Sequence, residues 1–192
     1  IASRVRCEAS DNPTSLIWET WRSNPGYSKL DEPIRFRYHV YVDTLVDTHR
    51  NDDRILVWDV MNEPWVTEIF VGNYDDPLPG EFARYFCTRI LDKGCGVPIT
   101  VGAGTLDRAL RLVDCVDVIS FHCYQHDEKL SREVGRAREV SEQHGKPVLL
   151  TECLAASILE DAGATTDGGQ LAAYQRDLPV LAQAPIGWFQ FG

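Results

Sequence analysis

The run from Ile55 to Pro64 constrains the fold of this chain more than any other segment. Its first residues are mostly large and apolar, as in a strand that is buried on both faces of a parallel sheet. Pro64 has no backbone N–H and cannot extend the ladder, so the strand should stop with Glu63 at its carboxyl end. A carboxylate there is costly unless the strand opens onto a polar cleft. In barrels and doubly wound sheets, functional clefts lie at that end of the strands.

The rest of the chain alternates short apolar strands with helices. We expect strands at 54–63, 98–102, 116–124, 146–152 and 187–192, and helices at 80–93, 106–113, 128–144 and 169–182. An amphipathic helix is expected upstream at 32–50, preceded by a loop at 11–30 and by one more strand at 4–9. Alternation of this kind is typical of β/α units built around a parallel sheet. Since no linker or shift in composition interrupts it, we expect residues 1–192 to form a single domain.

Charge and cysteine content exclude several classes of function. The net charge of −10 disfavours nucleic acid and anionic membranes as partners, and no stretch approaches the roughly 18 apolar residues that span a bilayer. None of the six cysteines forms a C-x-x-C motif, so buried free thiols are expected. His122 and Cys123 are adjacent on a strand and point to opposite faces, which argues against a zinc site. We expect no metal and no cofactor. The compartment, secreted or cytoplasmic, and the oligomeric state stay open.

Two glutamates at strand ends favour a barrel over an open sheet. Glu63 ends one predicted strand and Glu152 ends another, with two strands between them. In an eight-stranded barrel, strands three apart face each other across the mouth, so these two carboxyl groups converge. In an open sheet their convergence would be accidental. A pair of facing carboxyl groups suits the cleavage of a glycosidic bond, in which one gives a proton to the leaving oxygen and the other attacks the anomeric carbon.

The segments around both glutamates resemble a known enzyme family. Trp58–Pro64, with its Asn-Glu-Pro ending, is similar to the strand-4 motif of retaining glycoside hydrolases of the cellulase-like clan, in particular family 5. This resemblance implies that Glu63 is the general acid/base and that Asn62 contacts a sugar hydroxyl beside the scissile bond. Pro147–Glu152 resembles strand 7 of that family, which makes Glu152 the nucleophile.

Two further segments extend the resemblance to the substrate-binding residues. Val118–Tyr124 resembles strand 6, where the residues equivalent to His122 and Tyr124 line the site. The segment 187–192 resembles strand 8, whose tryptophan, here Trp188, commonly stacks on a sugar ring. Carbohydrate also packs on other aromatic side chains, and further candidates in the expected loops are Trp18, Trp21, Trp65 and Tyr74.

The resemblance predicts a (β/α)8 TIM barrel that is present only in part. A complete barrel needs about 250 residues, and we identify strands 3 to 8 without strands 1 and 2 or the helix after strand 8. The predicted function is hydrolysis of a β-linked glycan or glycoside by the retaining mechanism. One alternative is a catalytically silent carbohydrate-binding barrel. A second is a barrel that uses glutamate as a base on a small metabolite, but its phosphate loop would have to be Gly168-Gly169, which is more typical of a helix start.

Overall fold

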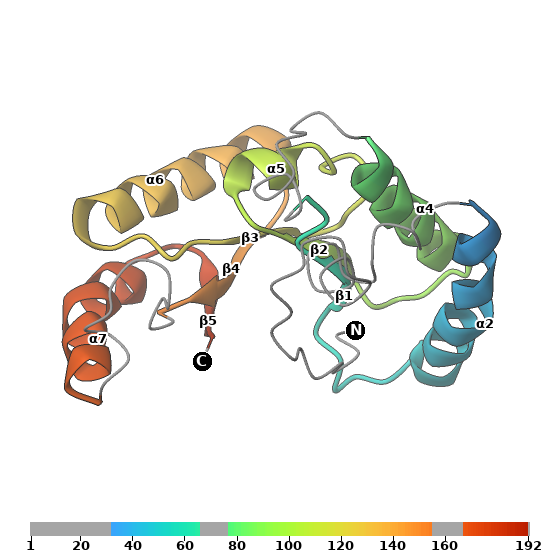
Figure 1. Ribbon diagram of the computed structural model, residues 1–192, viewed down its shortest axis with the longest axis horizontal. Helices are drawn as coiled ribbons and strands as arrows, with labels where there is room; N and C mark the ends of the chain where they lie inside the picture. The colour runs from blue at the N-terminus through green and yellow to red at the C-terminus, as the bar shows by residue number, and fades with distance from the viewer. Residues whose placement is uncertain (1–31, 66–76, 155–166, 192) are drawn as a thin grey trace, which may run out of the picture.

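The described part of the chain is a curved parallel sheet with helices along one side. The computed structural model describes residues 32–65, 77–154 and 167–191 (Figure 1). Five strands follow one another in chain order, each parallel to the next. This order has no reversal of the kind that defines a doubly wound sheet. The predicted β/α alternation is therefore confirmed, and its topology is that of consecutive units of a (β/α)8 barrel.

The strands are shorter than the sequence predicts. They are β1 (Trp58–Asn62), β2 (Ile99–Ala103), β3 (Ile119–His122), β4 (Val148–Cys153) and β5 (Gly187–Gln190). The first predicted strand begins at 54, but the ladder begins only where Trp58 donates its N–H to the carbonyl of Pro98. Since Pro98 has no N–H to continue the pairing, the residues before Trp58 have no partner on β2. The apolar run therefore predicts the strand correctly and overestimates its length.

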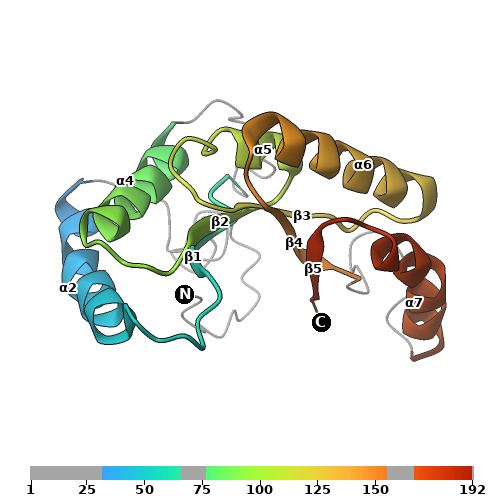
Figure 2. The ribbon, with the colours of Figure 1, turned by 180° about the vertical axis from the view of Figure 1, so that it is seen from behind.

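The helices lie close to their predicted positions. They are α2 (Glu32–His49), α4 (Leu78–Asp92), α5 (Leu106–Leu110), α6 (Asp127–His144) and α7 (Asp167–Ala182). Figure 2 shows α4, α5 and α6 arching along the same side of the sheet. Two apolar clusters fill the space beneath them, one under α5, α6 and α7 and the other under α2 and α4. Gly168 and Gly169 lie in the first turn of α7, so the predicted helix start is confirmed there.

The opposite face of the sheet carries polar side chains. Ile119 and Phe121 of β3 belong to the core beneath the helices, so Ser120 and His122 between and beyond them project to the other face. Ser120 is buried, and its hydroxyl lies 2.7 Å from the hydroxyl of Thr151 on β4. In a β/α barrel this face points to the interior, and its carboxyl end opens to the mouth. The functional side chains discussed below lie at that end.

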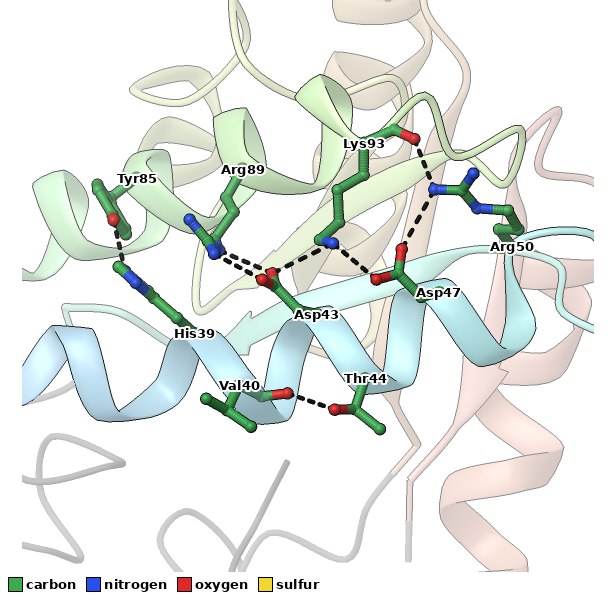
Figure 3. A network of polar contacts seen from close by, with 9 residues as sticks. All are labelled: His39, Val40, Asp43, Thr44, Asp47, Arg50, Tyr85, Arg89 and Lys93. Atoms are coloured by element: carbon green, nitrogen blue, oxygen red, sulfur yellow. Dashed lines mark hydrogen bonds and ion pairs between the residues drawn. The ribbon is translucent and has the colours of Figure 1, made fainter.

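Helix α2 is held on α4 by charged and aromatic contacts. Arg89 forms a bidentate pair with Asp43, at 2.8 and 2.6 Å, and Lys93 lies 2.9 Å from Asp47 (Figure 3). The ring of His39 stacks on Tyr85 at the other end of the same interface. These contacts lie at the rim of the apolar cluster under the two helices. They fix how α2 is oriented on the β1–β2 unit.

A buried carboxylate anchors the start of α6 to α7. Asp177 on α7 is 1% exposed, and its Oδ2 lies 2.7 Å from Nδ1 of His126. Its Oδ1 accepts the backbone N–H of Asp127, an amide in the first turn of α6 that has no partner within the helix. Burial acts to raise the pKa of Asp177, but the hydrogen bonds from Arg176 and His126 outweigh it and hold that pKa below its usual value. The loop between β3 and α6 is thereby fixed at the mouth.

Other sequence expectations have mixed outcomes. Among the described cysteines none is in a disulfide, and Cys87, Cys115, Cys123 and Cys153 are buried, as predicted. No helix in the described ranges is both long enough and apolar enough to cross a bilayer. The strand expected at 4–9 and the loop at 11–30 lie outside the described residues.

Candidate functional site

Glu63 projects from the carboxyl end of β1 through a sharp change in backbone direction. Its φ of 45° is in the left-handed region, which costs a non-glycine residue on the order of 1–2 kcal/mol. A hydrogen bond of 2.7 Å from the N–H of Glu63 to the carbonyl of Gly102 on β2 holds this conformation. Pro64 follows immediately, so the ladder ends here as the sequence predicts. The strained backbone turns the carboxyl group toward the neighbouring strands.

His122 connects the two predicted catalytic glutamates. Its Nδ1 lies 2.7 Å from Oε1 of Glu63 and 3.3 Å from Oε2 of Glu152. The imidazole side chain is only 1% exposed, whereas the side chains of Glu63 and Glu152 keep 22% and 17%. The register pairs His122 with Glu152, because an irregularity after Phe121 brings the two residues opposite each other. Both carboxyl groups therefore converge on one buried imidazole and stay partly open to solvent.

Tyr124 supplies a second partner to Glu152. Its phenol donates a short hydrogen bond to Oε2 of Glu152. Burial, together with this bond, raises the pKa of Tyr124 well above its usual value, so the phenol stays protonated and remains a donor. Phe191 beyond β5 contacts the tyrosine edge to face, with ring centroids 6.3 Å apart. The nucleophile candidate thus has a permanent hydrogen-bond donor on one side and an imidazole on the other.

The same three groups have a spacing that would suit a metal ion. One carboxylate or imidazole atom from each of Glu63, His122 and Glu152 lies within 4.8 Å of the others. These atoms already take part in direct hydrogen bonds, one between Nδ1 of His122 and Glu63 and another from the phenol of Tyr124 to Glu152. The cluster is satisfied by its own donors and acceptors, and we assign no metal to it.

Sequence reasoning missed Asp59, which lies on β1 behind the cluster. Its Oδ1 accepts the backbone N–H of Gly102 at 2.9 Å. Although much of the residue is exposed, protein atoms crowd its carboxyl group, and this desolvation raises the pKa of Asp59 against the opposing effects of Gly102 and His122. A signal was available in the sequence, since an acidic residue within an apolar run is costly unless it is hydrogen-bonded.

The remaining predicted residues have different surroundings. Asn62 is exposed at the end of β1, next to Glu63. Trp188 pairs with Leu150 and packs against the core beneath the helices, so the structure does not bring it to the cluster. Trp65 lies in a turn after β1, outside the strands and helices as expected, but it is 4% exposed within the core under α4, with the guanidinium of Arg111 5.2 Å from its ring. Its ring is therefore not available as a sugar platform. The other aromatic candidates, Trp18, Trp21 and Tyr74, lie outside the described residues.

Comparisons with known proteins place this site on a familiar fold. No family model matches the chain, and neither does any curated protein. Among solved structures, the chain is similar to a β-glucuronidase from an uncultured Clostridium species, with a TM-score of 0.56 and 15% identity over 82% of this chain and 29% of the other. It is also similar to a family GH113 β-mannanase from Alicyclobacillus acidocaldarius in complex with ManMIm, with a TM-score of 0.57 and 19% identity over 90% of this chain and 58% of the other.

These similarities, together with the sheet, show the fold. The described strands and helices are a partial (β/α)8 barrel, as the sequence predicts. The chain spans 29% of the glucuronidase and 58% of the mannanase. At the identities found, the likeness concerns architecture. The chemistry has to be argued from the residues at the carboxyl ends of the strands.

Proposed function

We propose that the chain is the catalytic part of a retaining β-glycosidase, a hydrolase that cleaves O-glycosidic bonds of a β-linked glycan or glycoside. The observation that carries this proposal is the approach of Glu63 and Glu152, which offer carboxylate oxygens within 4.8 Å of each other. Retaining enzymes keep the two carboxyl groups about 5–5.5 Å apart, whereas inverting enzymes need about 6.5–9.5 Å to admit a water molecule. The short separation supports double displacement. The glycoside hydrolase names of the structural neighbours agree with this class.

The two glutamates take opposite roles in the first step. Glu63 transfers its carboxylic proton to the glycosidic oxygen while the bond from that oxygen to the anomeric carbon breaks. An oxygen of Glu152 uses a lone pair to form the new bond to the anomeric carbon. Glu152 suits the role of nucleophile because the phenol of Tyr124 donates a hydrogen bond to its carboxyl group and holds that group in place.

The second step returns the enzyme to its starting state. Glu63, now ionised, accepts a proton from a water molecule, whose oxygen attacks the anomeric carbon and displaces Glu152. The sugar leaves with its original anomeric configuration, because two inversions have occurred. Asn62 and Tyr124 are proposed to contact substrate around the two carboxyl groups, and the buried His122 to line the site by contacting both glutamates. The substrate is proposed to be a carbohydrate that binds at the carboxyl ends of the strands, where Glu63 and Glu152 lie.

Loss and rescue of the nucleophile test this proposal. We expect Glu152→Ala to abolish the hydrolysis of aryl β-glycosides and azide to restore part of the turnover as an α-glycosyl azide, because the small anion fills the vacant position and displaces the leaving group with a single inversion. Glu142→Ala is the matched control, since Glu142 is an exposed glutamate on α6 whose side chain keeps 71% exposure. Wild-type rates in Glu152→Ala would overturn the assignment. Binding of β-glycans without hydrolysis by the unmodified protein would favour the catalytically silent barrel instead.

A further inference from the structure

Tyr124, the hydrogen-bond donor to Glu152, lies between two fixed points of the backbone. The pairing of β3 with β4 extends to Cys123, which donates its N–H to the carbonyl of Glu152 at 3.0 Å. The next helix, α6, begins at Asp127. Only three residues, 124–126, lie between Cys123 and Asp127. The position of the tyrosine therefore depends on how firmly each of these two points is held.

A carboxylate on α7 holds the second point. The side chain of Asp177 is buried, with Oδ2 2.7 Å from Nδ1 of His126 and Oδ1 accepting the N–H of Asp127 at 3.2 Å. Arg176 donates to both oxygens, at 3.0 and 3.1 Å, and so fixes the orientation of the carboxylate. Asp177 thus bonds the side chain of one loop residue and the backbone amide of the next.

The backbone at Asp127 depends on this support. Its φ of 51° lies in the left-handed region, which costs a residue other than glycine on the order of 1–2 kcal/mol. Such a conformation persists only where surrounding contacts hold it, and the bond from its N–H to Asp177 is one that does. Without that bond, the strain favours a different path of the chain between β3 and α6. Tyr124 lies on that path.

The other contacts of Tyr124 cannot replace this support. Its phenol donates to Glu152, a residue of β4 whose place is set by the ladder, whereas Tyr124 itself lies in the loop after β3. Its ring also contacts Phe191 edge to face, and a pair of this kind contributes about 0.5–1.5 kcal/mol. That is no more than the strain at Asp127. The bond to Glu152 is therefore kept only while the loop is held.

We propose that Asp177 is a positioning residue for the nucleophile, which fixes the loop between β3 and α6 so that Tyr124 keeps its hydrogen bond to Glu152. Asp177 acts through the loop and does not touch the substrate. The catalytic meaning of this inference rests on the proposed function, whereas the coupling of Asp177 to Tyr124 does not.

The hydrogen bond of Tyr124 can be followed by NMR. The ¹³Cζ resonance of a tyrosine shifts when its phenol donates to a carboxylate. Its loss in Tyr124→Phe assigns the signal, and Glu152→Ala gives its position without the acceptor. We expect Asp177→Asn to move the signal about half or more of the way to that position, because the neutral amide no longer makes charge-assisted bonds to His126 and Arg176. An unmoved signal would overturn the proposal.

Asp43→Asn is the matched control. Asp43 also forms a bidentate pair with an arginine, Arg89, at 2.8 and 2.6 Å, but it lies on α2, at the opposite end of the sheet from α7 (Figure 1). We expect this variant to leave the ¹³Cζ signal of Tyr124 in place. An equal movement in both variants would mean that the loss of any such ion pair has this effect, and it would also overturn the proposal.

His126→Ala covers the case in which Asp177→Asn does not fold. This variant removes one partner of Asp177 and leaves the bond to the N–H of Asp127, so we expect a smaller movement of the Tyr124 signal in the same direction. His144→Ala removes another half-buried histidine, at the far end of α6, and should leave the signal in place. An unmoved signal in His126→Ala would then overturn the proposal.

Turnover gives a second readout, which a merely structural role would not produce. Because Asp177 acts through Tyr124, Asp177→Asn should lower turnover about threefold or more in the unmodified chain and have little further effect in Tyr124→Phe, where the donor is already absent. Independent effects that multiply would overturn the proposal. The NMR measurement uses no substrate, so a coupled but inactive protein would refute the proposed function alone. An active protein with an unmoved signal would refute this inference alone.

Discussion

The crowding around Gly102 predicts that one methyl group should destabilise the protein. A Cβ there would lie 2.8 Å from the carboxylate of Asp59, closer than side-chain atoms ordinarily approach. Gly102→Ala would therefore push Asp59 away from the backbone N–H whose hydrogen bond it accepts. The new methyl group would also press on His122, whose Nε2 lies 3.1 Å from the position of the Cβ. Overpacking of this kind costs about 1–3 kcal/mol. The methyl group should also lower turnover, because the imidazole that contacts Glu63 is displaced.

Gly135 on α6 offers the same substitution with the opposite expected sign. Nothing lies within 4 Å of the position of its Cβ, and it is an exposed residue within the helix. Since alanine is a better helix former than glycine by about 1 kcal/mol, Gly135→Ala should stabilise the fold. Urea unfolding followed by circular dichroism would measure both free energies of unfolding. A Gly102→Ala protein as stable as the unmodified chain would refute the packing argument.

Three other substitutions test separate parts of the structure. Tyr124→Phe should lower turnover about tenfold or more, because Glu152 loses its phenol donor and a hydrogen bond to a charged group contributes about 1.5–3 kcal/mol. Steady-state kinetics would measure this loss, and an unchanged melting temperature would show that the fold is intact. Asp177→Ala should cost about 3–5 kcal/mol near neutral pH. Because the fold lowers the pKa of Asp177, its carboxylate stabilises the folded protein above the unfolded pKa, near 3.8, and this stabilisation is lost as the pH falls through the folded pKa. Urea unfolding should therefore show a smaller loss of stability for Asp177→Ala in acid than at neutral pH. Arg89→Ala should cost less than about 1 kcal/mol, because its pair with Asp43 is partly exposed, and a larger loss in thermal unfolding would contradict this estimate.

Local patterns in the chain were sufficient to predict most of the fold. Short apolar runs separated by amphipathic helices give β/α units, and a sheet built from such consecutive units keeps the strands in chain order. Strand lengths were less predictable, because they depend on a partner. The strand expected from 54 begins at Trp58, since pairing starts only where the chain meets Pro98. A run of apolar residues cannot report where its neighbour begins.

The candidate site was predicted where residues lie at strand ends and missed where the sheet itself brings residues together. Glu63 and Glu152 could be paired from strand order alone. Asp59 could not, because its place depends on Gly102 of the next strand, whose missing side chain leaves room for the Asp59 carboxylate. Trp65 was expected in a loop around the cleft, and it does lie in a turn, but its ring is buried in the apolar cluster beneath α4.

Trapping the covalent intermediate tests the central claim most directly. In a 2-deoxy-2-fluoro glycoside, the fluorine slows both displacements, whereas an activated leaving group speeds the first one. The glycosyl-enzyme therefore forms faster than it is hydrolysed, and it accumulates. Glucoside, mannoside and glucuronide forms of the reagent would be used side by side, and mass spectrometry of proteolytic peptides would locate the attached sugar. The account predicts one added sugar, attached to Glu152, and none in Glu152→Ala. A sugar attached to another residue, or turnover of these reagents with no adduct, would contradict it.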